Sequence, residues 1–200
     1  MEAADLTACD LADVLPRSQV VDRQISPLYT PIPRILGPAY TVHCPPGDNL
    51  MMHAAIYDAP AGAVIVARSE DGLSAMVGGN VCAMAQQRGI AGMVIDGVAR
   101  DLNEIRDLRF PVFSRGLCPK PAVKKKAGAS TPKIVCGGVE VSSDDLVLAD
   151  EEGIVVVPSS SAEQLVKDAI KKAEKAASTP LKAWSENHQR VIREALKAAK

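Results

Sequence analysis

Several features that quickly assign a chain to a class are scarce or missing here. Aromatic residues make up only 3% of the 200 residues, so Val, Ile, Leu, Ala and Met must fill any core. The formal net charge is -1, which removes an overall electrostatic attraction to nucleic acid or to an anionic membrane. No apolar run approaches the ~20 residues that span a bilayer. We therefore expect no nucleic-acid partner and no membrane association.

Cysteine is present but forms no recognisable pattern. The five cysteines are scattered, odd in number and without a CxxC pair: Cys9, Cys44, Cys82, Cys118 and Cys136. This usage predicts reduced thiols in a cytoplasmic protein and argues against a zinc site. The first residues are acidic and lack the basic segment of a signal peptide, which also favours a cytoplasmic location.

The hydrophobic content of 47% is enough for one full core, and the pattern of the chain predicts an α/β domain. We expect a domain over residues 1–177 and a helical tail over residues 178–200. A helix is predicted at residues 5–15, and the proline-rich residues 16–38 are expected to be extended and irregular. The predicted strands are residues 39–43, 63–67, 92–95, 112–113, 134–135, 139–141, 146–148 and 154–157. The other predicted helices are residues 49–58, 81–88, a short one from 102, 162–177 and 181–200.

The most informative stretch is residues 89–101, where an apolar strand runs into a turn that ends in Arg100 and Asp101. Open α/β folds place ligands at the carboxyl ends of buried strands. The guanidinium can bind an anion and the carboxylate can hold a cation. Each also has a plainer interpretation: Arg100 as a surface ion pair, and Asp101 as a helix cap that forms a capping box with Glu104.

A second candidate is the helix start at Gly78, Gly79, Asn80 and Val81. Free backbone N–H groups and the positive end of the helix dipole suit a carboxylate. The alternative is simply a glycine-rich entry into a helix.

The histidines and lysines give weaker indications of a functional site. His43, His53 and His188 form no nucleophile–base arrangement, and each is expected to be structural or exposed. The lysines at 124–126 are interpreted as a solvated loop. No lysine stands in an apolar strand, which disfavours a Schiff-base aldolase. No GxGxxG turn follows a strand, which disfavours a nucleotide or adenosyl cofactor.

Taken in order, the motifs resemble the RraA-like family, which includes 4-hydroxy-4-methyl-2-oxoglutarate aldolases and the bacterial regulator of ribonuclease E activity. The resemblance covers roughly residues 6–175 and rests on residues 37–42, 47–49, 78–80, 89–101, 110–113, 137–141, 145–150 and 153–158. It implies a layered β/β/α swivelling-type domain that assembles as a homotrimer or hexamer, with active sites between subunits.

The resemblance also implies a function. It suggests a class II pyruvyl aldolase that depends on Mg²⁺ or Mn²⁺, cleaves 4-hydroxy-4-methyl-2-oxoglutarate-type 2-oxo acids to pyruvate, and decarboxylates oxaloacetate. Asp101 would hold the metal and Arg100 would stabilise the enolate at the 2-oxo oxygen. Gly78, Gly79, Asn80 and Val81, with Arg100, would bind the substrate.

One position departs from the family pattern. Many members carry Asp or Glu twenty-one residues before the arginine, where this chain has Gly79. Asp96 or Asp48 could supply a second acid, and Glu174 is a candidate for donation across a subunit interface. The departure keeps two alternatives open: a non-catalytic regulator that binds a ribonuclease E-type partner, and a same-fold enzyme acting on another 2-oxo acid.

Overall fold

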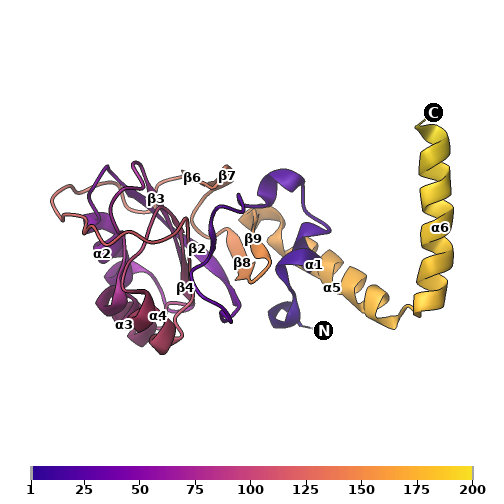
Figure 1. Ribbon diagram of the computed structural model, residues 1–200, viewed down its shortest axis with the longest axis horizontal. Helices are drawn as coiled ribbons and strands as arrows, with labels where there is room; N and C mark the ends of the chain where they lie inside the picture. Colours follow the sequence, from indigo (N-terminus) through magenta and orange to yellow (C-terminus); the bar gives the residue numbers. More distant parts are fainter. Residues whose placement is uncertain (1, 200) are drawn as a thin grey trace.

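The computed structural model describes residues 2–199 and is built on a seven-stranded sheet in the order β1-β5-β4-β3-β2-β8-β9 (Figure 1). The strands β2, β3, β4 and β5 run parallel, whereas β1, β8 and β9 pair antiparallel at the two sides. The strands of this sheet are β1 (Ser26–Pro27), β2 (Ile35–Cys44), β3 (Val64–Ser69), β4 (Gly92–Asp96), β5 (Val112–Ser114), β8 (Leu146–Asp150) and β9 (Gly153–Val157).

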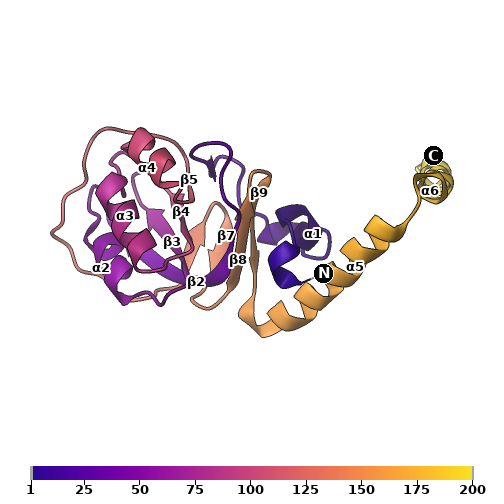
Figure 2. The same ribbon diagram turned by 90° about the horizontal axis from the view of Figure 1, so that it is seen from below.

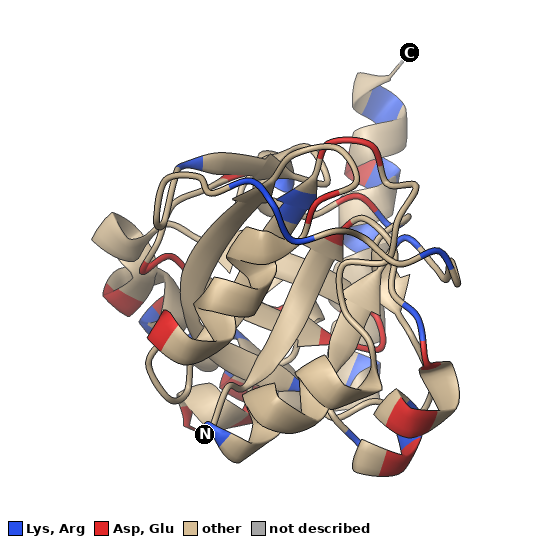
Figure 3. Cartoon of the chain, turned by 90° about the vertical axis from the view of Figure 1, so that its left-hand side faces the viewer, with Lys and Arg blue, Asp and Glu red and all other residues tan. Residues whose placement is uncertain are grey.

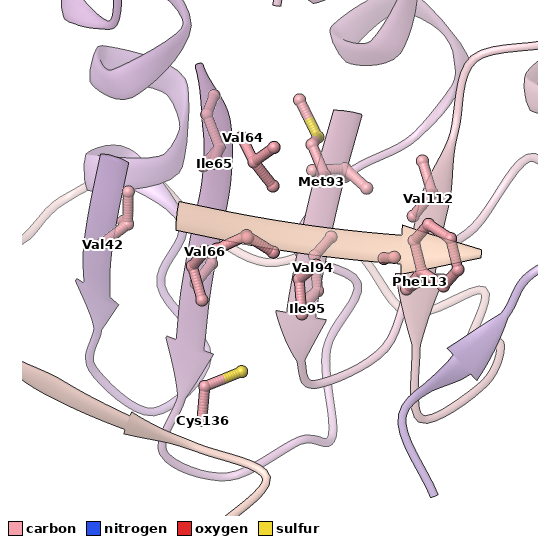
Figure 4. Close-up of a cluster of buried hydrophobic side chains, with 14 of the residues drawn as sticks. Val42, Val64, Ile65, Val66, Met93, Val94, Ile95, Val112, Phe113 and Cys136 are labelled. Atoms are coloured by element: carbon pink, nitrogen blue, oxygen red, sulfur yellow. The ribbon is translucent and has the colours of Figure 1, made fainter. Parts of the chain in front are cut away.

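The parallel half of the sheet carries the main core. Val64, Ile65 and Val66 in β3 are buried, as are Met93 and Ile95 in β4, as expected for strands covered on both faces (Figure 4). One face is covered by three helices (Figure 2), α2 (Leu50–Asp58), α3 (Gly79–Gln87) and α4 (Leu102–Leu108). A hairpin of β6 (Ile134–Cys136) and β7 (Val139–Val141) contacts this half through β2 and β3.

The long strand β2 joins two differently paired parts of the sheet. Its first residues pair antiparallel with β8, and from Ala39 onward it pairs in parallel with β3. Pro38 lies where the partner changes. A proline, which cannot donate to a ladder, is tolerated there. The prediction of irregular chain up to residue 38 is therefore wrong from Ile35 onward.

A second layer packs on β8 and β9. The short α1 (Ala8–Ala12) and the longer α5 (Ala162–Ser178) bury Leu11, Leu148 and Val157 in a separate apolar cluster. Thr7 caps α1, because its side chain accepts from the N–H of Asp10 in a capping box. The predicted helix over residues 5–15 is thus shorter than expected, and 3₁₀ turns lie at Ala3–Asp5, Arg17–Gln19 and Ser159–Ser161.

The last helix, α6 (Leu181–Ala198), extends away from the layers (Figure 1). Pro180 separates it from α5. Its large apolar side chains are exposed: Leu181, Trp184, Val191, Ile192 and Leu196. The α/β class and the C-terminal helices expected from the sequence are confirmed. The structure ends α5 at Ser178, one residue past the expected boundary at 177, but does not test the division into domain and tail.

Acidic and basic residues alternate along the chain on the side of the molecule that Figure 3 shows, and neither kind is confined to one element. Among residues 2–199, no helix is both long and apolar enough to cross a membrane.

Candidate active site

A small polar cavity of about 100 Å³ lies at the start of α3. Four separate segments meet there: the start of α2, the start of α3, the turn after β4, and the loop after β5. The residues that line this polar cavity are Asn49, His53, Ala75, Val77, Gly78, Asn80, Val81, Arg100, Asp101, Pro121, Ala122 and Lys124. The structure therefore brings Arg100 and Asp101 together with three of the four residues predicted at the helix start.

The first turn of α3 offers backbone donors to this cavity. Gly78 is the N-cap, and the N–H of Cys82 is the first to be bonded within the helix, to the Gly78 carbonyl oxygen. The N–H groups of Asn80 and Val81 therefore have no carbonyl partner inside the helix. Together with the helix dipole they form a site suited to a carboxylate.

Asp101 is turned toward α3 and does not cap its own helix. Its backbone is left-handed (φ 59°), and no side-chain cap hydrogen bond forms at the start of α4. Its Oδ2 instead accepts from the N–H of Gly79 at 3.1 Å and lies 3.4 Å from Nε of Arg100. The capping-box interpretation of Asp101 and Glu104 is therefore wrong. A Cβ on Gly78 would lie only 2.2 Å from Oδ2 of Asp101, so this approach requires glycine.

The departure at Gly79 has a structural counterpart in Glu104. An ideal Cβ on Gly79 would lie 1.7 Å from Oε2 of Glu104 and 2.7 Å from its Cβ. The carboxylate of Glu104 thus occupies the space that a side chain at position 79 would need. Gly79 itself does not line the cavity, and its N–H is used by Asp101.

Among the cavity residues that were not predicted from the sequence, three have polar side chains: Asn49, His53 and Lys124. Asn49 is 5% exposed, and its Nδ2 donates to the Met76 carbonyl at 2.9 Å. Its Oδ1 is buried and has no hydrogen-bond partner among the described residues. Burial, and then the charge of Lys124, lower the pKa of His53, which favours its neutral imidazole. The expectation that His53 is only structural and Lys124 only part of a solvated loop missed their place in the cavity.

The other acidic residues considered from the sequence, Asp48, Asp96 and Glu174, lie outside the cavity. Asp48 is buried, and its Oδ2 accepts from the N–H groups of Lys125 and Lys126 at 2.7 and 3.0 Å, which fixes the loop that carries Lys124. Asp96 binds Arg115 and the N–H of Gly137. Neither carboxylate lines the cavity. Glu174 lies on α5, on the opposite side of the sheet from α3 and α4 (Figure 1).

The family resemblance implies a divalent metal, so we ask which side chains near the cavity could be its ligands. Among residues 2–199, no three His, Cys, Asp or Glu side chains converge as a metal-binding group. Asp101 offers one partly exposed carboxylate, which is compatible with Mg²⁺ because this ion keeps several of its waters. The nearby thiol of Cys82 is not a nucleophile, since burial, and then the charge of Asp101, raise its pKa to about 12.

Fold and site together define an α/β protein in which free backbone amides at a helix start lie beside an Arg–Asp pair. Known proteins are similar to this chain in sequence and in fold. The family model described as "RraA-like: Aldolase/RraA" matches residues 8–156. A protein of Halalkalibacterium halodurans named "Putative 4-hydroxy-4-methyl-2-oxoglutarate aldolase" is 39% identical over 140 residues, 70% of this chain and 67% of that protein. A Burkholderia mallei (strain SAVP1) protein of the same name is 31% identical over 138 residues, 67% of this chain and 83% of its own length.

Among solved structures, the RNA-processing inhibitor RraA of Thermus thermophilus superposes with a TM-score of 0.69 at 27% identity. The match covers 79% of this chain and 94% of that one. The chain belongs to the RraA-like family, as its motifs indicated. Relatives within this family carry the names both of an aldolase and of an inhibitor of RNA processing.

Proposed function

We propose that the protein is a divalent-metal-dependent carbon–carbon lyase that cleaves 4-hydroxy-2-oxo acids to pyruvate and decarboxylates oxaloacetate. The observation that carries the proposal is the meeting of Arg100, Asp101 and the free amides of α3 in one cavity. A binding surface for another protein does not need this combination. The names of the relatives support the same class of reaction.

Each part of the cavity has a role in this reaction. The amides of Asn80 and Val81 bind the pyruvyl carboxylate at the positive end of α3. Arg100 donates to the 2-oxo oxygen, on which negative charge grows as the C3–C4 bond breaks and the enolate forms. Asp101 would hold the divalent cation, which supplies Lewis-acid polarisation of the 2-oxo group when bound. Lys124 adds a second positive charge to the same cavity.

The test is pyruvate release from oxaloacetate with Mg²⁺, with Mn²⁺, and with EDTA. We expect release with either metal and its loss on chelation, after subtraction of the metal-only rate without protein. Protein that releases no pyruvate under any of these conditions would contradict the proposal. It would favour the non-catalytic regulator, in line with the Thermus thermophilus structure, which is named an RNA-processing inhibitor.

A further inference from the structure

Two carboxylates from one end of α4 reach the same residue of α3. Oδ2 of Asp101, at the N-cap of α4, accepts from the N–H of Gly79 at 3.1 Å. Oε2 of Glu104, in the first turn of α4, lies 1.7 Å from the ideal position of a Cβ on Gly79. The two helices lie side by side (Figure 2), and the absence of a side chain at position 79 lets both acids approach the first turn of α3.

The two carboxylates differ in what they contact. Asp101 is held by the N–H of Gly79 and lies 3.4 Å from Nε of Arg100. Glu104 is exposed, and within the described residues 2–199 its carboxylate has no hydrogen bond and no ion pair. Its oxygens are therefore available to accept hydrogen bonds from a group other than these residues.

Two negative charges held against one glycine repel each other, and a cation beside them offsets this repulsion. On the proposed function, Asp101 holds such a cation. Mg²⁺ keeps several of its waters when a protein binds it, and these waters direct their hydrogens away from the ion. Groups that accept from the ligands of a bound metal orient those ligands, and loss of such a group typically costs about 10- to 100-fold in metal affinity or activity. A carboxylate beside Asp101 whose oxygens are still available is suited to this task.

We propose that Glu104 is the second acidic group of this site, and that its carboxylate accepts hydrogen bonds from the waters of the cation held by Asp101. Glu104 is then a positioning residue, since it acts through those waters and does not line the polar cavity. The proposal also gives a reason for glycine at position 79, because a side chain there would displace the Glu104 carboxylate. This inference rests on the proposed function and adds a residue to its metal site.

Calorimetric titration with Mn²⁺ tests this role without relying on turnover. Glu104→Gln keeps the shape of the side chain and removes its charge, so the Kd for Mn²⁺ should rise by about 10- to 100-fold. The melting temperature should stay within a few degrees of the parent's. Asp107→Asn removes another exposed carboxylate of α4 and should leave the Kd unchanged. An unchanged Kd in Glu104→Gln would overturn the inference.

Moving the carboxylate to the other helix separates charge from packing. Gly79→Asp/Glu104→Gly directs an acid from α3 into the space that Glu104 leaves, and the backbone of Gly79 is not left-handed. This double variant should recover most of the Mn²⁺ affinity that Glu104→Gly loses. Gly79→Asn/Glu104→Gly has the same shape without the charge and should not recover it. Equal affinities in the two double variants would contradict the proposed role.

Oxaloacetate turnover by the parent protein is measured in parallel, so that the inference and the proposed function can fail separately. A parent that binds Mn²⁺ and releases pyruvate, beside a Glu104→Gln variant of equal affinity, would overturn the inference alone. A parent that binds no Mn²⁺ and releases no pyruvate would overturn the proposed function and the inference with it.

Discussion

Arg100 and Asp101 are neighbours in the chain, yet the structure holds their side chains by different contacts. The backbone N–H of Arg100 is bonded to the Val77 carbonyl, and its side chain is 43% exposed beside the cavity. The left-handed backbone of Asp101 turns the carboxylate toward the first turn of α3. A carboxylate and a guanidinium are thus presented to the same small cavity.

Arg100→Ala should mainly lower kcat for oxaloacetate decarboxylation, because in the proposed mechanism the arginine interacts most strongly with the developing enolate. Loss of one such donor costs about 2.7–4 kcal/mol, or roughly a hundred- to thousandfold in rate. Arg100→Lys should recover little, since an ammonium lacks the planar fork of donors. Steady-state kinetics provide the measurement. Arg106→Ala, on the exposed side of α4, is the control, and a fully active Arg100→Ala protein would show that the assigned role is wrong.

Asp101→Asn should separate structure from metal binding. Asn tolerates the left-handed backbone, and its amide oxygen can still accept from the N–H of Gly79, so the melting temperature should stay within a few degrees of the parent's. A neutral amide is a poorer ligand for a hard cation, so Mn²⁺ affinity and metal-dependent pyruvate formation should fall together.

Calorimetric titration with Mn²⁺ measures this affinity without relying on turnover. As a control, Asp107→Asn removes an exposed carboxylate from α4, the helix that follows Asp101. This variant should bind Mn²⁺ like the parent. If Asp101→Asn binds Mn²⁺ as tightly as the parent, the metal ligand has to be sought elsewhere in the chain.

At the scale of elements, α3 and α4 approach each other closely because position 79 has no side chain. Gly79→Ala should therefore destabilise the fold by about 1–3 kcal/mol, as expected for overpacking, since Cβ of Glu104 cannot move aside as its carboxylate can. In a protein of this size that corresponds to a fall in melting temperature of about 2–4 °C per kcal/mol.

The double variant Gly79→Ala/Glu104→Gly tests whether the clash with Glu104 causes the loss of stability. Measured against Glu104→Gly alone, the alanine at position 79 should cost little, because the obstructing side chain is gone. An unchanged penalty in the double variant would place the strain elsewhere in the first turn of α3.

Periodicity and turn residues were sufficient to predict most elements. The strands near 64, 93 and 155 and the helices α2, α3 and α5 lie close to their expected places, because apolar runs and helix-start residues mark them locally. The pairing of β2 with both β3 and β8 was not predictable. The proline-rich sequence before residue 39 predicts irregular chain, and only the positions of the neighbouring strands show that part of it is a strand.

The candidate site was only partly predictable for the same reason. Arg100, Asp101 and the start of α3 are marked by local glycine and charge patterns. Lys124 is not, because three consecutive lysines look alike whether they are solvated or directed to a cavity. Its position depends on Asp48, a carboxylate 76 residues earlier in the chain, which binds the next two backbone amides.

At the scale of the whole molecule, α6 stands out because a single chain leaves its apolar side chains exposed. Its apolar residues lie on one side of the helix, while charged residues such as Glu186, Arg190 and Arg193 lie on the other, and the apolar side is exposed. A ring stack of Trp184 on His188, with centroids 4.6 Å apart, lies along it. An exposed apolar face of this length is typical of a surface that another chain covers.

We expect the protein to be an obligate oligomer, a trimer or a pair of trimers, to which α6 contributes. Ile192→Glu should shift the population toward smaller species in sedimentation velocity, because it places a charge in the apolar face. Arg193→Glu alters the opposite side of the helix and should leave assembly unchanged. A parent protein that sediments as a monomer at micromolar concentration would contradict the expectation.

The tether between Asp48 and the loop after β5 has a consequence for how this protein can diversify. Asp48 grips main-chain amides at 125 and 126, so the path of the loop is independent of which side chains those positions carry, proline excepted. Mutational drift can therefore replace the lysines one at a time without displacing the backbone. Position 124 is then free to acquire a new residue facing the polar cavity while the scaffold stays constant, which makes this loop the natural starting point for altering substrate selectivity by directed evolution.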